Sequence, residues 1–160
     1  MRKLIPLATV IAIAGALAGG VAAGTAATRA TPTRIKCKWT SYNPTPTQAS
    51  GFVIGFIKCP QPLGHGVISA TYSSTFNPTT GAGTANGKWT KWLLNGTAHG
   101  HYSQTFQFTS NTNATYQSTL VWTGGTGAYT GVKGTGTDSC TTTDGGATET
   151  CQSVDEVTGL

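Results

Sequence analysis

The side chains that could do chemistry in this chain are few and unevenly placed. The five acidic residues all lie within the last 23 positions, at Asp138, Asp144, Glu149, Asp155 and Glu156. Glycoside hydrolysis needs a pair of carboxyl groups. However, Asp144 precedes a Gly-Gly turn, and Asp155-Glu156 stands near the C-terminus, where we expect solvated side chains. No serine lies in a G-x-S-x-G motif. We therefore predict no catalytic residue and do not expect an enzyme.

A histidine motif is the second candidate. His99-Gly100-His101 places two imidazoles on one face of a strand, because side chains i and i+2 point the same way. His65 could complete a set of three metal ligands. The pair lies beside a predicted turn, so we interpret it as exposed histidines, and we predict neither a metal site nor a cofactor.

The N-terminus has the layout of a secretory signal peptide. Arg2 and Lys3 precede an apolar run that reaches about Ala23, and small residues follow. We expect a signal peptide at 1–27, cleavage between Ala23 and Ala30, a flexible tail at 28–34 and one domain at 35–160. A retained membrane anchor is the alternative, since the run approaches spanning length. No second such run follows, so we expect a secreted protein, of bacterial type, with no membrane partner after cleavage.

The charges predict no nucleic-acid partner. Removal of the signal peptide leaves eight of the ten cations against five acids, a net charge of about +3. The cations are spread along the chain, whereas a nucleic-acid groove usually needs a dense basic cluster. The sequence does not predict an oligomeric state.

The four cysteines predict two disulfides in a secreted chain. Between Cys140 and Cys151 runs TTTDGGATET, whose central Gly-Gly suits a two-residue hairpin turn and sets these cysteines opposite one another. Cys37 and Cys59 are then left to each other, and symmetric pairing about Gln48 would align them. A zinc site is the alternative, but no CxxC motif is present.

Alternating polar and apolar residues, frequent Thr, and turns at Gly and Asn predict an all-β fold. The second expected strand is apolar on both faces, so we expect it to be central or covered. Eight strands in sequential hairpins could close as an antiparallel up-and-down barrel or pack as a β-sandwich. The expected strands are 35–42, 52–59, 67–76, 84–94, 97–109, 114–123, 128–140 and 148–157.

Aromatic residues recur along these strands. If some of them face a barrel interior, they line a pocket for a small apolar ligand. Their other role is to fill the core. The candidate ligand-binding residues are Tyr72, Phe76, Trp89, Trp92, Tyr102, Phe106, Tyr116, Trp122 and Tyr129.

A glycine-rich stretch, WTGGTGAYTGVKGTGT, spans residues 122–137. Pairing about Gly125-Thr126 would set Trp122 opposite Tyr129. Glycines inside the following strand would make room for large side chains nearby.

The segment GGTGAYTGVKG, residues 124–134, resembles the glycine motif of dirigent proteins and the allene oxide cyclase-like barrel group. The resemblance implies an eight-stranded, calycin-like antiparallel barrel with an interior pocket.

These observations favour a secreted, non-catalytic barrel that binds a small hydrophobic molecule or acts as a scaffold. One alternative is an allene oxide cyclase-like isomerase or cyclase, which the glycine motif implies. The other is a carbohydrate- or surface-binding module, which would need tryptophans in a row facing solvent.

Overall fold

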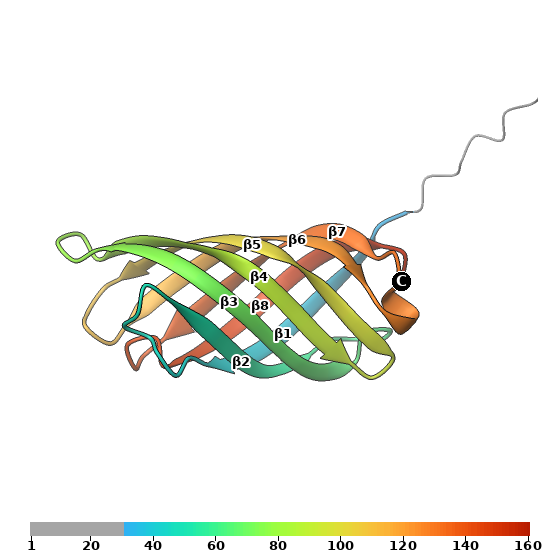
Figure 1. Ribbon diagram of the computed structural model, residues 1–160, viewed down its shortest axis with the longest axis horizontal. Coiled ribbons are helices and arrows are strands. Elements are labelled where there is room, and N and C mark those ends of the chain that lie inside the picture. The colour runs from blue at the N-terminus through green and yellow to red at the C-terminus, as the bar shows by residue number, and fades with distance from the viewer. Residues whose placement is uncertain (1–30) are drawn as a thin grey trace, which may run out of the picture.

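The computed structural model describes residues 31–160 as one closed barrel (Figure 1). Each strand pairs antiparallel with the next, and β1 pairs with β8 to complete the ring. The barrel predicted from the sequence is therefore confirmed, and the sandwich is not formed. The strands are β1 (Thr33–Tyr42), β2 (Ser50–Lys58), β3 (His65–Asn77), β4 (Ala82–Leu93), β5 (Gly96–Phe108), β6 (Ala114–Gly125), β7 (Lys133–Thr142) and β8 (Thr148–Thr158).

The predicted signal peptide, 1–27, lies outside the described residues. β1 begins at Thr33, so the last two residues of the expected tail, Thr33 and Arg34, belong to the barrel. Within residues 31–160 the chain forms no helix that is long and apolar enough to cross a membrane.

Alternation along each strand separates the inside of the barrel from the outside. Successive side chains of a strand point to opposite faces, and β6 buries every second residue from Ala114 to Trp122. β8 does the same from Glu149 to Val157. Polar as well as apolar side chains therefore enter the lumen at every position whose side chain points inward.

One end of the barrel is filled. The β2–β3 connection folds Leu63 into the lumen, and a short 3₁₀ helix, η1 (Gly127–Tyr129), brings Tyr129 in from the β6–β7 connection. The Tyr129 hydroxyl donates to the Pro62 carbonyl oxygen at 3.4 Å. With Val132 these residues pack on the apolar core, and together they close this end.

Both predicted disulfides are present, Cys37–Cys59 and Cys140–Cys151. Cys140 lies opposite Cys151 in the β7–β8 ladder, and Lys38 lies opposite Lys58, which is the register expected around Gln48. The bridges close segments with sequence separations of 22 and 11 residues. By the chain-entropy relation each would stabilise the fold by about 3 kcal/mol.

The predicted pairing of Trp122 with Tyr129 is wrong. Trp122 lies opposite Gly134, because the connection after β6 is longer than a tight turn and contains η1. β7 consequently begins at Lys133 rather than at Ala128. Both aromatic side chains nevertheless pack in the same closed-end core.

The expectation that the second strand is covered on both faces is also wrong. The inward residues of β2 are buried, but the outward residues Phe52, Ile54 and Phe56 are exposed in the described chain. Closure of the barrel gives every strand one face toward solvent, so a second apolar face on β2 stays uncovered.

Candidate ligand cavity

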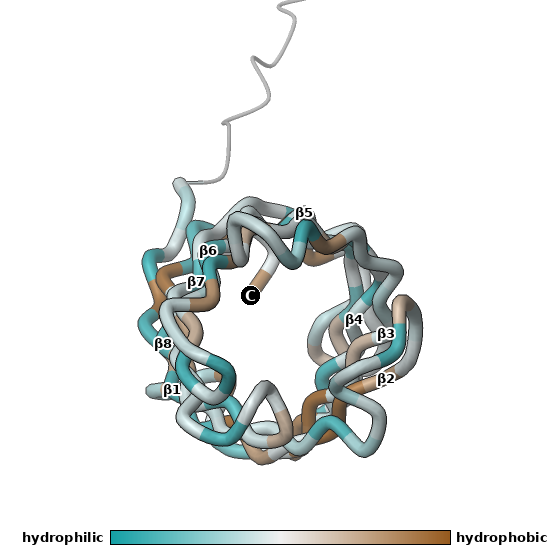
Figure 2. The backbone as a smooth tube through the Cα atoms, turned by 90° about the vertical axis from the view of Figure 1, so that its left-hand side faces the viewer, coloured by the Kyte–Doolittle hydropathy of each residue, from teal (hydrophilic) through white to brown (hydrophobic). Residues whose placement is uncertain are grey.

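The other end of the barrel opens into a cavity of about 800 Å³. Figure 2 looks along the barrel from this end, past the connections β1–β2, β3–β4, β5–β6 and β7–β8. All four connections contribute residues to the cavity wall, among them Pro46, Thr79, Asn111 and Gly146. The cavity therefore occupies the half of the lumen that the closed-end core leaves unfilled.

The structure brings six of the nine predicted aromatic residues to this cavity. They are Tyr72, Phe76, Trp89, Tyr102, Phe106 and Tyr116. Trp122 and Tyr129 lie beneath the cavity in the closed-end core, and Trp92 points outward with 47% of its surface exposed. Ligand binding by any of them stays a prediction.

The buried carboxyl groups of the lumen were not predicted from the sequence. Asp138 and Glu149 line the cavity, and Asp155, which was expected in solvent, lies deeper. Asp155 is fully buried, with 0% of its surface exposed. The signal was present in the alternation of β8, since Glu149 and Asp155 share a strand face with Cys151, whose bridge must lie inside the barrel.

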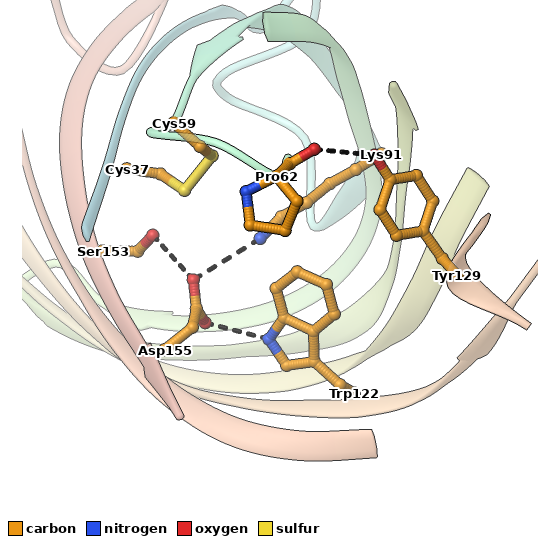
Figure 3. The surroundings of a disulfide bond; sticks show 8 residues. All are labelled: Cys37, Cys59, Pro62, Lys91, Trp122, Tyr129, Ser153 and Asp155. Atoms are coloured by element: carbon orange, nitrogen blue, oxygen red, sulfur yellow. Dashed lines mark hydrogen bonds and ion pairs between the residues drawn. A yellow bond between two sulfur atoms is a disulfide. The ribbon is translucent and has the colours of Figure 1, made fainter. Parts of the chain in front are cut away.

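A buried ion pair forms the floor of the cavity (Figure 3). Lys91 Nζ lies 3.7 Å from Asp155 Oδ2. The same carboxylate accepts hydrogen bonds from Trp122 Nε1 at 2.9 Å and from the Ser153 hydroxyl at 3.0 Å. Three strands therefore meet at Asp155, because Lys91 comes from β4, Trp122 from β6, and Ser153 from β8, the strand of Asp155 itself.

This carboxylate and two indole rings stabilise the buried ammonium group of Lys91. Its Nζ lies 4.1 Å from the centroid of Trp122 and 4.8 Å from that of Trp89. It has no hydrogen-bond partner within the described chain. Burial lowers the pKa of Lys91, and the Asp155 charge opposes that change. The cation–π contacts partly replace the lost hydration.

Inward-facing glycines make room for this cluster. A Cβ atom at Gly136 would overlap the Asp155 carboxylate, and one at Gly100 would overlap the Trp89 ring. Glycines of β7 were expected to make room for large side chains, and Gly100 of β5 has this role for Trp89. At Gly136 the neighbour that needs the space is a carboxylate rather than an aromatic ring.

Two carboxyl groups in the cavity have raised pKa values. Burial, with a contribution from the Asp138 charge, raises the pKa of Glu149 to about 7, although the Ser41 hydroxyl lies 3.5 Å from its Oε2 and favours the ionised form. Burial also raises the pKa of Asp138, against the effect of its hydrogen bond with Ser118. Near neutral pH this wall can therefore either donate or accept a proton.

Hydroxyl and amide groups complete the polar wall. The Tyr72 hydroxyl donates to the Thr45 carbonyl oxygen at 2.7 Å, and Gln104 Nε2 donates to the Ser118 hydroxyl at 3.1 Å. Burial raises the pKa values of Tyr102 and Tyr116, so both phenols stay protonated. The cavity thus combines aromatic surfaces with fixed hydrogen-bonding groups.

The three histidines do not enter the lumen. His65, His99 and His101 are exposed on the strands that carry them. Among residues 31–160, one group of potential metal ligands joins Glu149 to Cys140 and Cys151. These two cysteines are bonded to each other, so they do not offer thiolates to a metal.

Comparison with protein families, with curated proteins and with solved structures finds no match to this chain. The structure shows the eight-stranded antiparallel barrel, and membership of the dirigent and allene oxide cyclase-like group stays a prediction from the glycine motif at 124–134.

Replacement of Asp155 tests the floor of the cavity. Asp155→Asn keeps an acceptor for Trp122 but leaves Lys91 as a buried cation without a counter-charge. We expect the free energy of unfolding, measured by urea denaturation at pH 7, to fall by about 3–5 kcal/mol. The double variant Lys91→Met/Asp155→Leu removes both charges and should recover most of that loss. Equal stability of Asp155→Asn and the parent would contradict this account of the pair.

The raised pKa of Glu149 predicts a pH dependence of stability. Between about pH 4.5 and 7 the native carboxyl group is protonated while the unfolded one is ionised. Stability therefore falls as pH rises through this window, by up to about 3 kcal/mol from this residue. Glu149→Gln should remove that part of the decline, whereas Glu156→Gln, on the exposed face of β8, should not. A parent curve that rises across this window would contradict the prediction.

Proposed function

We propose that this protein is a non-catalytic binding protein that holds one small molecule in the open half of the barrel. The supporting observation is the cavity of about 800 Å³, whose size falls within the range of small-molecule sites. The ligand has an apolar, ring-bearing body and at least one group that donates or accepts hydrogen bonds.

The arrangement of the wall supports this ligand class. Near the mouth, the ring centroids of Phe76 and Phe106 are 6.1 Å apart, and those of Phe106 and Tyr116 are 5.7 Å apart. An apolar body would pack against these rings. Its polar group would meet Asp138 and Glu149, where a ligand hydroxyl or amine replaces lost hydration.

The two disulfides indicate an oxidising compartment, as the predicted signal peptide does. We infer that the protein works outside the cytoplasm. The bridges would hold the lumen open there, since they tie β1 to the start of the β2–β3 connection and β7 to β8.

Tryptophan fluorescence tests the binding function. Trp39 and Trp89 line the cavity, so a ligand that enters it should shift or quench their emission. We expect a response from members of a panel of aromatic and aliphatic alcohols, amines and carboxylic acids, recorded in a Trp92→Phe background.

Blocking the cavity supplies the control. Ala70→Phe, which points into the cavity, should weaken binding about tenfold or more, equivalent to 1.4 kcal/mol or more. Thr71→Phe, the next residue and on the exposed face, should leave binding unchanged. No response to any compound, or an equal effect of both substitutions, would argue against a lumenal ligand.

A second candidate function is an isomerase or cyclase of the allene oxide cyclase-like kind. The observation that favours it is the Glu149 carboxyl group, whose pKa of about 7 suits general acid–base chemistry at neutral pH. Asp138, also in the cavity wall, would take the complementary role. The carbohydrate-binding alternative lacks such support, because Trp39 and Trp89 line the lumen while Trp92 faces solvent.

Product analysis separates catalysis from binding. Compounds that bind are incubated with the parent and with Glu149→Gln, and isomeric products are measured across pH 5–9. Catalysis by Glu149 predicts turnover that Glu149→Gln lowers about 100-fold or more while affinity stays similar. If the parent leaves every compound of the panel unchanged, catalysis is excluded for these compounds. The proposed binding function is then unaffected.

A further inference from the structure

An apolar patch covers the outer face of β1 to β4. We define it by Tyr42, Phe52, Ile54, Phe56, Val67 and Trp92. Phe56 has 78% of its surface exposed, Tyr42 57% and Phe52 51%. Singly scattered apolar residues on a surface need no explanation, whereas a contiguous group marks an interaction site.

The registers of the strands show that the patch is continuous. Tyr42 lies opposite Ile54, Phe56 lies opposite Val67, and Val67 lies opposite Trp92. Phe52, Ile54 and Phe56 follow one another at every second position of β2, so they share its outer face. Figure 2 shows hydrophobic colouring along β2 in the wall of the barrel.

Cations border the patch. Lys38 lies opposite Lys58 beside Phe56, and both are exposed. Lys88 stands beyond the other end, on β4. No acidic residue occurs in the sequence before Asp138, so no carboxylate of β1 to β4 offsets these charges.

The positions of the acidic residues make the distribution of charge on the outer surface more uneven. Three of the five lie inside the barrel, at Asp138, Glu149 and Asp155. The two others, Asp144 and Glu156, lie in the β7–β8 turn and on β8, where Glu156 faces Arg34 across the ladder. The outer surface around the patch is therefore more cationic than the net charge of the chain indicates.

We propose that this patch adsorbs the protein to the surface of an anionic lipid bilayer. Exposed Phe, Ile and Trp side chains insert at the boundary between headgroups and acyl chains, and lysines beside them are attracted to anionic headgroups. The patch lies on the convex side of a barrel, which suits a deformable surface better than a partner with a matching groove. Adsorption holds the barrel on its side and leaves the mouth of the cavity free.

The charges favour lipid over a second copy of the chain. Two copies joined patch to patch would bring the bordering lysines of both into one interface, with no carboxylate of β1 to β4 to pair with them. The expectation of no membrane partner came from the lack of a second spanning segment, and adsorption requires none. This proposal uses the outer face and is independent of the function proposed for the lumen.

Vesicle co-sedimentation tests the proposal on residues 28–160. We expect binding to vesicles of phosphatidylcholine with 30% phosphatidylglycerol, about tenfold or more stronger than to phosphatidylcholine alone, weakened by salt. Lys38→Gln/Lys58→Gln should weaken binding about thirtyfold. Phe56→Ser should weaken it about tenfold.

Matched variants and outcomes complete the design. Lys133→Gln and Leu160→Ser remove an exposed cation and an exposed apolar side chain outside the patch, and both should bind like the parent. Thermal unfolding of each variant checks that it folds. Absence of binding to either vesicle would overturn the proposal, as would full binding by folded Phe56→Ser. A dimer in light scattering that Phe56→Ser dissociates, without vesicle binding, would assign the patch to a second copy and also overturn it.

Discussion

Pairing of the first strand with the last is the constraint on which the rest of this structure depends. β1 and β8 form a continuous ladder from Thr33 opposite Val157 to Tyr42 opposite Thr148. This ladder leaves no unpaired strand edge in the barrel. It also divides every strand into an inward and an outward face. Once the ring is closed, the identity of each second residue decides what the lumen contains.

The lumen has two halves with different energetics. At the closed end, Leu63, Tyr129 and Val132 complete an apolar core that stabilises the fold through burial. In the open half, burial of the Asp138 and Glu149 carboxyl groups disfavours their charged forms. This cost in free energy is the main reason that their pKa values are raised. The ion pair between Lys91 and Asp155 lies where the two halves meet. Retention of costly groups beside a cavity is typical of functional sites.

The same closure gives the molecule opposite characters inside and outside. Carboxyl groups enter the lumen from β7 and β8, while Lys38, Lys58 and Lys88 and the apolar patch lie on the outer face of β1 to β4. The polar wall of the lumen and the apolar patch on the outer face are separate surfaces that share strands. A barrel can therefore hold a small molecule and lie on a larger surface without competition between the two.

The sequence by itself determined the class of fold, the number and order of the strands, and the disulfides. These features depend on local signals: alternation, the Gly-Gly turn between Cys140 and Cys151, and the count of four cysteines. Trp122 and Tyr129 were misplaced because η1 lengthens the β6–β7 connection, and no local pattern revealed it. Only the tertiary structure decided that Trp92 faces solvent and that one end of the lumen is open. These features depend on which alternate residues of a strand point into the barrel, and on which loops fold over an end of the barrel. Contacts between residues far apart in the chain set both, and no short window of sequence contains them.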